Sequence, residues 1–395
     1  MMPPMPPPIP VPPPRGFALF ALGFRPFYLA ASLFAALSVV LWIGDYSGFL
    51  PRAYGGDPVR HAHEMIYGFA VAVIVGFLFT AGRNWSNRPT PQGPLLAAFV
   101  GLWLAGRALM FTPWTMTAAV VSAAFPVAAA VALAVPFARS RDRRNYFFVG
   151  LLVAIGAVEF AVHLAMRGTI AWPAVAGLQV GLDLVLFIMA AMSGRVIAMF
   201  TNNAIPGAGA TRLPAVERFA MGSLIALIAV DLLPTPPAIV ALVAAAAAIA
   251  HAVRLALWRP WRTLRTPLVW ILHLAYGWIV LHLAMRAVGV FGWVPVTLAT
   301  HALTVGAIGS LTVGMMTRTA LGHTGRALAA GRGEVVCYVL VTFAALVRVF
   351  GAMLAPSHYV ATVVASGLLW AAAYGAYAVL YAPLLVRPRV DGKPG

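Results

Sequence analysis

Residues 61–85 read His-Ala-His-Glu-Met-Ile-Tyr-Gly-Phe-Ala-Val-Ala-Val-Ile-Val-Gly-Phe-Leu-Phe-Thr-Ala-Gly-Arg-Asn-Trp. Between Glu64 and Arg83 this stretch has no charged side chain. An α-helix needs about 20 apolar residues to cross the hydrocarbon core of a bilayer, because it rises about 1.5 Å per residue. The stretch therefore predicts a transmembrane helix with histidines at one end and an arginine at the other.

The rest of the chain repeats this pattern. Of its 395 residues, 62% are apolar and 9% are charged, whereas soluble proteins have about 45–50% apolar and about 25% charged residues. Twelve apolar segments are separated by short polar breaks; they cover residues 25–43, 61–82, 94–111, 115–137, 146–166, 174–198, 216–233, 236–257, 267–287, 296–318, 334–354 and 358–386. We therefore expect an all-α, polytopic integral membrane protein with about twelve transmembrane helices in a single domain, residues 17–386.

The basic residues predict the orientation of these helices. The chain has 27 Lys+Arg against 10 Asp+Glu, with Lys393 its only lysine. Such a balance can indicate nucleic-acid binding, but no soluble domain remains to carry that surface, so we expect no nucleic-acid partner. Loops after even-numbered segments hold twelve arginines, and loops after odd-numbered segments hold three. Since cytoplasmic loops are enriched in arginine and lysine, both termini are expected to be cytoplasmic.

The two ends of the chain are predicted to be short cytoplasmic tails. Nine of the first fourteen residues are proline and none is basic, so residues 1–16 resemble a proline-rich tail rather than a secretory signal. Residues 387–395 form a short basic tail. The only cysteine is Cys337, which excludes an internal disulfide, a Cys-held iron–sulfur cluster and a covalently attached haem. Any metal is then held mainly by His, carboxylate or Met.

The histidines are the main candidates for that role, because ionisable groups inside a bilayer are expensive and usually functional. The topology places His61, His63 and His301 near the outer surface and His273 in the inner third. We expect an outer metal site, formed by His61 or His63 with His301, and an inner site formed by His273, for which His323 is a candidate partner. On a regular helix His61 and His63 point about 200° apart, so one of them serves a different centre or the membrane interface.

Two further features fit a bound haem. Gly306, Gly309 and Gly314 follow His301 and give its helix a small face that can receive either another helix or a flat ligand. Arg195 and Arg318 end their segments at the cytoplasmic face, where arginines hold haem propionates or anchor a helix at lipid headgroups.

Six stretches resemble one family, the NnrS-like membrane proteins. They are FALGFRPFYLAA from Phe20, the opening stretch 61–85, LWLAGR ending at Arg107, GLDLVLFIMAAMSGRVIAMFTNNA (181–204), PLVWILHLAYGW (267–278) and HALTVGAIGSLTVGMMTRTALGHTGR (301–326). The resemblance covers most of the chain and implies twelve transmembrane helices, with non-covalent b-type haem and copper as cofactors.

The resemblance also selects residues. It implies His61, His63, His273, His301 and His323 as the metal-ligand candidates, and it leaves His163, His251, His282 and His358 outside the motifs. It adds a set of pocket or propionate-side residues: Arg25, Arg83, Asn84, Asp183, Arg195, Asn202, Arg318 and Arg326. It does not assign which histidine holds haem and which holds copper.

The function that the resemblance implies is nitric oxide metabolism or tolerance of nitrosative stress in the bacterial inner membrane. Nitric oxide or a metal–nitrosyl species is the expected ligand, membrane lipid the expected surrounding, and the electron donor and any catalysed reaction are not assigned. A secondary transporter is the alternative, since twelve helices are common there and Asp183 and Glu159 lie at membrane depth. A nitric oxide reductase or oxidase-like enzyme ranks lower, because the sequence has no His-His dipeptide.

Overall fold

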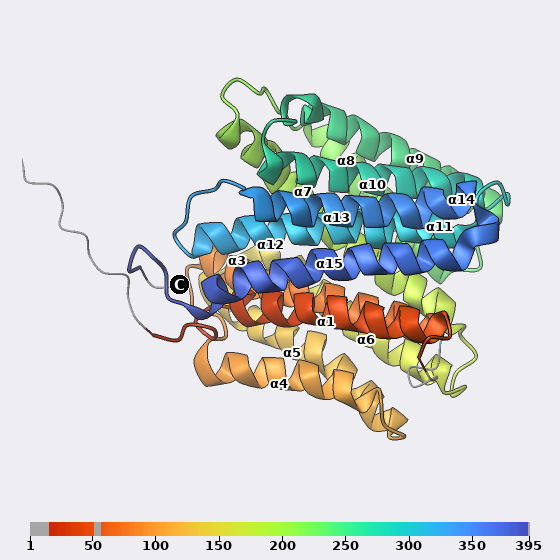
Figure 1. Cartoon of the computed structure of the whole chain (residues 1–395), viewed down its shortest axis with the longest axis horizontal. Helices are drawn as coiled ribbons and strands as arrows, with labels where there is room; N and C mark the ends of the chain where they lie inside the picture. Colours follow the sequence, from red (N-terminus) through yellow and green to blue (C-terminus); the bar gives the residue numbers. More distant parts are fainter. Residues whose placement is uncertain (1–15, 51–56, 394–395) are drawn as a thin grey trace, which may run out of the picture.

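The computed structural model describes residues 16–50 and 57–393 and is a bundle of helices lying nearly side by side (Figure 1). The described residues contain no β-strand, so the prediction of an all-α polytopic membrane protein is confirmed. The predicted tail at residues 1–16 lies almost wholly outside the described residues. The last few residues of the described chain, from Arg387 to Lys393, run along the end of the bundle.

A helical segment stands at each of the twelve predicted positions. The first six are α1 (Phe24–Tyr46), α2–η1–α3 (Pro58–His63, Glu64–Ala70, Val71–Ser86), α4 (Gly93–Leu109), α5 (Thr115–Ser140), α6 (Tyr146–Met166) and α7 (Ala174–Ala204). The second six are α8 (Pro214–Leu232), α9 (Pro237–Leu257), α10 (Pro267–Gly289), α11–η4–α12 (Val296–His301, Ala302–Gly309, Ser310–His323), α13–η5–α14 (Arg332–Leu346, Val347–Gly351, Ala352–Leu354) and α15 (Tyr359–Val386). Short 3₁₀ turns, η2 (Arg143–Asn145), η3 (Pro260–Arg262) and η6 (Pro356–His358), join some of them.

Ten of these segments in the described chain are long and apolar enough to cross a membrane. The other two are α4, which is apolar but has only 17 residues, and α8, which carries Glu217, Arg218 and Asp231. Both pack lengthwise on neighbouring helices in the bundle, α4 on α5 and α8 on α7 and α9 (Figure 1). A total of twelve crossings remains the prediction, with ten segments meeting the requirement by length and composition.

The two ends of the described chain meet at one end of the bundle, which we call the terminal end. The backbone N–H of Ala18 donates to the carbonyl of Val386 at 2.8 Å, and Arg25 Nη1 donates to the carbonyls of Leu385 and Arg387 at 2.9 and 2.7 Å. Both chain ends lie at the left of Figure 1. Because the two chain ends meet at the same end of the bundle, the chain crosses it an even number of times, as the arginine pattern predicts. That the terminal end faces the cytoplasm stays a prediction.

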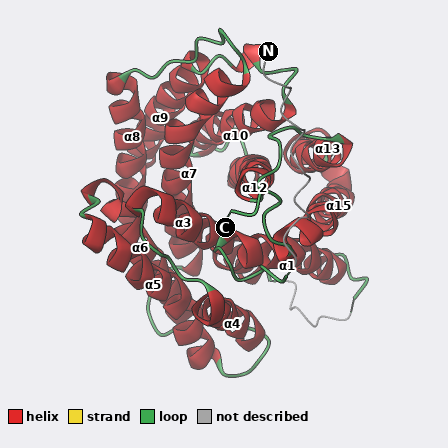
Figure 2. Ribbon diagram, turned by 90° about the vertical axis from the view of Figure 1, so that its left-hand side faces the viewer, coloured by secondary structure: helices red, strands yellow, loops and turns green. Residues whose placement is uncertain are grey.

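Proline and aspartate explain where several helices begin. Asp57 caps α2 by accepting a hydrogen bond from the N–H of Val59 at 2.9 Å, and Pro58 takes the first helical position, where its missing N–H costs nothing. Prolines open α8, α9 and α10 in the same way. The bundle is layered, with α3, α7 and α12 inside and α4, α5, α8 and α9 towards the outside (Figure 2).

Three of the long segments contain a π-helical stretch, in which the hydrogen bonds skip an extra residue. Each one adjoins an ionisable residue at membrane depth: η1 follows His63, η4 follows His301, and η5 contains Arg348. π-Helical turns cost stability and are frequent at functional sites, because they re-aim side chains that a regular helix would misplace.

The glycine face after His301 is filled by the protein itself. A side chain on Gly306 would overlap the indole of Trp278, and a Cβ on Gly309 would lie 2.6 Å from the ring of Trp370. Gly314 packs against Ile271 and Leu272 in the same way. Of the two occupants that the sequence allowed, a packed neighbour is the correct one here, because indoles and aliphatic side chains from α10 and α15 occupy the space that a haem ring would need.

Candidate metal centre and its surroundings

Five ionisable residues meet inside the bundle in what we call the His63 cluster: His63, Glu64, Arg107, Glu159 and His163. His63 ends α2, Glu64 begins η1, Arg107 lies in the last turn of α4, and Glu159 and His163 lie one turn apart on α6. All five are buried, and His63 and Glu64 have no exposed surface. Three separate helical segments therefore place ionisable side chains at one point in the interior.

The imidazoles of this cluster have free nitrogens. His63 Nδ1 lies 3.0 Å from Glu64 Oε1, so it donates its proton to that carboxylate and leaves the Nε2 lone pair unused. His63 Nε2 lies 3.6 Å from Glu159 Oε1, and the His163 ring stands edge-on to the His63 ring at 4.6 Å. The Nε2 atoms of His63 and His163 are buried without a hydrogen-bond partner among the described residues.

These donors form a set that suits a metal ion. One ligand atom each from His63, Glu159 and His163 lies within 4.8 Å of the other two, and no other group of three such side chains exists in the described chain. Two imidazoles and a carboxylate are ligands for zinc, copper or iron. The contact from Glu64 to His63 Nδ1 is the orienting bond that metal-ligating histidines usually have.

The charge in the cluster also favours a cation. Arg107 Nη1 donates to Glu64 at 2.7 Å, and its Nη2 donates to Ser122 at 2.7 Å and to Glu159 at 3.4 Å. Two buried carboxylates thus share one guanidinium in direct contact. An uncompensated charge in an apolar interior is costly, so a bound cation or a proton stabilises the group.

The sequence-based selection missed two of the three candidate metal ligands of this centre. It named His63, but it left His163 outside the motifs and considered Glu159 only for a transporter. Glu159 and His163 are four residues apart on one helix, which places them on the same face, and this spacing is the signal that could have identified them. The two carboxylates suggested for transport, Asp183 and Glu159, both contact arginines, Asp183 through Arg286 Nη1 at 3.2 Å.

A second buried group, which we call the Arg254 cluster, contains Glu217, His251, Arg254 and Tyr276. Arg254 donates to both carboxylate oxygens of Glu217 at 3.0 and 2.5 Å and to the hydroxyl of Tyr276 at 2.8 Å. His251 Nδ1 lies 2.5 Å from the Tyr276 hydroxyl and its Nε2 lies 3.1 Å from the Ala220 carbonyl. Both imidazole nitrogens have partners, and Glu217 also accepts a contact from the more exposed Arg212 at 3.3 Å. This group therefore ties α8, α9 and α10 together.

The outer-site prediction paired His301 with His61 or His63, and this pairing stays a prediction. The His61 ring stacks on the Trp42 ring with centroids 4.0 Å apart, and Arg348 and His61 are close enough to act electrostatically on His301. His301 Nδ1 lies 2.5 Å from the Thr297 carbonyl, which leaves its Nε2 available. His63 faces α6, so the two histidines of the Arg60–Met65 stretch serve different places.

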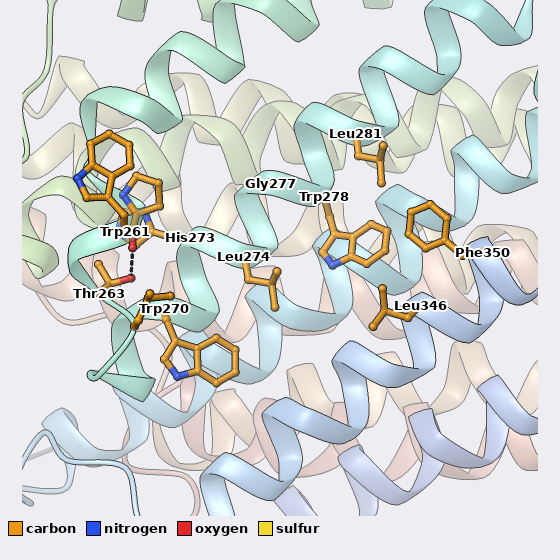
Figure 3. Close-up of a pocket in the computed structure, with 12 residues that line it drawn as sticks. Trp261, Thr263, Trp270, His273, Leu274, Gly277, Trp278, Leu281, Leu346 and Phe350 are labelled. Atoms are coloured by element: carbon orange, nitrogen blue, oxygen red, sulfur yellow. Dashed lines mark hydrogen bonds between the residues drawn. The ribbon is translucent and has the colours of Figure 1, made fainter.

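The inner-site prediction joined His273 with His323, and the structure places them in different cavities. His323 lines a cavity of about 430 Å³ with Asn84, Arg144, Arg195 and Arg318, which we call the Arg318 cavity. His273 lines a groove of about 690 Å³ along α10 (Figure 3). Within the described chain, the one group of three side chains able to hold a metal is His63, Glu159 and His163, and His273 is not part of it.

Two arginines of the Arg318 cavity match a site for an anionic group. The Arg318 guanidinium lies 3.8 Å from the centre of the Phe200 ring and makes no hydrogen bond or ion pair with the described residues, although only 8% of the residue is exposed. Arg195 donates to Asn145 at 2.5 Å and lies over the rings of Trp85, Phe147 and Phe148. Arg318 therefore keeps its donors for a ligand.

Two other predicted pocket residues, Arg25 and Asn202, have structural partners, whereas Arg326 Nη1 is buried without one among the described residues. Arg25 binds the carbonyls at the end of α15, as described above, and Asn202 exchanges two hydrogen bonds with the backbone of Ala210, at 2.9 and 3.0 Å. His282, which the motifs left out, donates from Nδ1 to the Ala299 carbonyl at 2.7 Å. A role of Arg25 as a cofactor ligand stays a prediction.

Comparison with known proteins gives one match. A family model described as "NnrS protein" matches residues 18–389, which is nearly the whole chain. The match includes every residue of the His63 cluster, the Arg254 cluster and the Arg318 cavity. No curated protein matches the chain.

Proposed function

The chain belongs to the NnrS family, and on that premise we propose that it is a bacterial inner-membrane protein that binds copper and haem and acts in nitric oxide metabolism or tolerance of nitrosative stress. The observation that carries this proposal is the His63 cluster. The unused Nε2 atoms of His63 and His163 and the carboxylate of Glu159 meet there at a buried point.

Copper fits the His63 cluster by the chemistry of its donors. His63 and His163 offer neutral nitrogens, Glu159 offers an oxygen, and imidazole is a preferred ligand of copper. Glu64 fixes the orientation of the His63 ring, and Arg107 holds Glu64 and Glu159 in place. A bound copper ion would supply a redox-active centre.

Haem fits the Arg318 cavity better than it fits the glycine face of α12. A cavity of about 430 Å³ is within the usual range for cofactors. His323 would hold the iron through an imidazole nitrogen, and Arg318 and Arg195 would hold the carboxylate groups of the haem. Ferrous haem would supply an iron that binds nitric oxide. The attachment is non-covalent, because Cys337 is the only cysteine.

The surroundings of both places suit a small apolar ligand. Nitric oxide dissolves in lipid and can reach a buried site without a water-filled channel. The His63 cluster lies among buried side chains, including the Tyr67 ring at 5.0 Å from His63. Excluding water strengthens each electrostatic contact inside, so Glu64 holds the His63 ring and Arg107 holds the carboxylates of Glu64 and Glu159.

The test is metal analysis and optical spectroscopy of the purified full-length chain beside two variants. His163→Ala is expected to lower the affinity for copper by about 100-fold and to leave the haem absorption unchanged. His323→Ala is expected to remove or shift the haem absorption while leaving copper. The exposed His358 provides the control His358→Ala. A wild-type protein with neither metal contradicts the proposal, and so does His163→Ala with unchanged copper.

A further inference from the structure

Two aspartates from different helices bind one arginine towards the end of the bundle that lies opposite the terminal end. Arg286, in the last turn of α10, donates from Nη1 to Asp183 of α7 at 3.2 Å and from Nη2 to Asp231, in the last turn of α8. Gln179, one turn before Asp183, donates to the same Asp183 oxygen at 3.0 Å. The helix that follows α10, α11, lies at the far end from the two chain ends (Figure 1). We call the two carboxyl groups the Asp183–Asp231 pair.

The charges in this group do not balance. Asp183 is buried, and the side chains of Asp231 and Arg286 are only 11% and 12% exposed. The two carboxylates carry two negative charges, and the guanidinium carries one positive charge. Because an uncompensated charge inside a membrane bundle is costly, one further positive charge is expected at this group.

The hydrogen bonding of the pair also lacks one hydrogen. Asp183 Oδ2 is buried and has no hydrogen-bond partner among the described residues. The carboxyl groups of Asp183 and Asp231 nevertheless lie within hydrogen-bond distance of each other. Two ionised carboxylates are both acceptors and repel each other. Their contact becomes a hydrogen bond only when one of them carries a proton, as in other close carboxyl pairs that share a single proton.

The neighbouring histidine does not supply the missing charge. His282 lies one turn before Arg286 on α10, and its Nδ1 donates to the Ala299 carbonyl at 2.7 Å. Its Nε2 is buried without a partner among the described residues. A second proton on this ring would therefore have no acceptor, so the neutral imidazole fits its surroundings better than the charged one.

The other helices packed around the pair contribute no compensating charge. On η1 and α6, Glu64, Glu159 and His163 belong to the His63 cluster, and Tyr67 of η1 is a neutral phenol. On α9, which packs on α8 and α10, no ionisable residue precedes His251. The missing positive charge therefore belongs to the pair itself.

A proton fits this place better than a metal ion does. The pair is not part of any group of three metal-ligating side chains in the described ranges, and the guanidinium of Arg286 would repel a metal cation. A proton needs no cavity, so the close packing around Asp183 does not exclude it.

We propose that the Asp183–Asp231 pair is a proton-binding site, in which the two carboxyl groups share one proton at neutral pH and exchange it with water at the end of the bundle opposite the terminal end. Asp231 supplies the route to water, because its partly exposed side chain lies beside the loop 233–236 that follows α8. The site needs no metal and shares no residue with the His63 cluster or the Arg318 cavity.

The experiment is infrared spectroscopy of the full-length protein in nanodiscs at neutral pH, with and without isotope-labelled aspartate carboxyl groups. A protonated carboxyl has a C=O stretching band that an ionised carboxylate lacks, and the label distinguishes aspartate from glutamate. We expect the wild type to show a label-sensitive band of this kind. The band should shift after transfer to heavy water, because the proton exchanges with solvent.

Three variants assign the band. Asp183→Asn and Asp231→Asn should each abolish it, because the remaining carboxylate then has Arg286 to itself and is ionised. Both amides resemble a protonated carboxyl in shape, so both variants should fold. Asp45→Asn is the matched control, since Asp45 is another buried aspartate, on α1, and this variant should keep the band.

Four results would overturn the proposal: no label-sensitive band in the wild type, no shift in heavy water, a band that survives in either variant of the pair, or its loss in Asp45→Asn. Loss of the band from the wild type on adding sodium or copper ions would also overturn it and would identify a metal site instead.

Discussion

The His63 cluster and the Arg254 cluster are both buried groups of histidine, arginine and glutamate within one bundle, yet their hydrogen bonding differs. In the Arg254 cluster each imidazole nitrogen has a partner, and Arg254 binds Glu217 through two parallel hydrogen bonds. In the His63 cluster the Nε2 atoms of His63 and His163 have no partner among the described residues. Burial alone therefore does not identify a binding site; unused donors and acceptors and unbalanced charge do.

The difference in charge has a physical consequence. In the Arg254 cluster the buried Arg254 guanidinium binds the single carboxylate of Glu217, which the more exposed Arg212 also contacts at 3.3 Å. The buried charge of Arg254 is therefore already paired, which offsets the cost of burying it. In the His63 cluster two carboxylates share Arg107, and another positive charge would stabilise them. The first group gains nothing from a ligand, while the second gains stability when a cation binds.

The largest expected effect comes from forcing Arg254 out of its place. A side chain on Gly194 would overlap the Arg254 guanidinium, so Gly194→Ala should leave Glu217 and Tyr276 without their partner. Breaking a buried pair in this way costs about 3–5 kcal/mol. Thermal unfolding of the purified protein measures the loss, with Gly222→Ala, a glycine of α8 that has no neighbour within 4 Å, as the control. Equal melting temperatures for the two variants would show that the Arg254 cluster is not a structural tie.

The second test neutralises one carboxylate in each cluster. Glu159→Gln balances the His63 cluster and removes a metal donor, so copper affinity should fall by about 10–100-fold while the metal-free protein keeps or slightly gains stability. Glu217→Gln should leave copper affinity unchanged and lower stability, because Arg254 loses its counter-charge. Copper titration and thermal unfolding of both variants are the measurements. If both variants lose stability equally and neither changes copper binding, the two clusters do not differ in kind.

The smallest effect on the melting temperature is expected from an exposed ion pair, which serves as a reference for the two buried clusters. Arg389 donates to both carboxylate oxygens of Asp391 at 2.9 and 2.6 Å, and these hydrogen bonds hold the pKa of Asp391 below its ordinary value. Its contribution to stability is present at neutral pH and is lost only as the pH falls below the usual range of aspartate, about 3.9. Asp391→Asn should therefore leave the melting temperature at pH 7 unchanged, since exposed pairs contribute little. A clear drop would contradict this.

Much of the fold could be predicted from hydropathy, because a helix that crosses lipid must satisfy all its backbone hydrogen bonds within itself. The apolar runs placed a helix at each of twelve positions. The meeting of Ala18 with Val386 agrees with the even number of crossings that the arginines require. The π-helical stretches at His63, His301 and Arg348 could not be predicted, since their residues suit a regular helix equally well.

The candidate sites were predictable in part. Membrane depth and family motifs selected His63, His301 and His323, but depth gives a residue's position along the membrane normal and not the direction in which it points. The predicted topology places His63 and His301 at similar depth, yet the His63 ring contacts His163 on α6, whereas His301 Nδ1 lies 2.5 Å from the carbonyl of Thr297 on its own helix. His273 and His323 line different cavities for the same reason.

The sequence by itself determined that this chain is a helical membrane protein, because the length of apolar runs and the placement of arginine are properties of the chain read in order. Its motif stretches, also read in order, resemble the NnrS family that the family match shows. Only the tertiary structure decided which histidines share a centre and which are already satisfied. Those outcomes depend on how helices distant in the sequence are rotated against each other. Rotation is set by packing, as where Gly194 admits Arg254 and Gly306 admits Trp278.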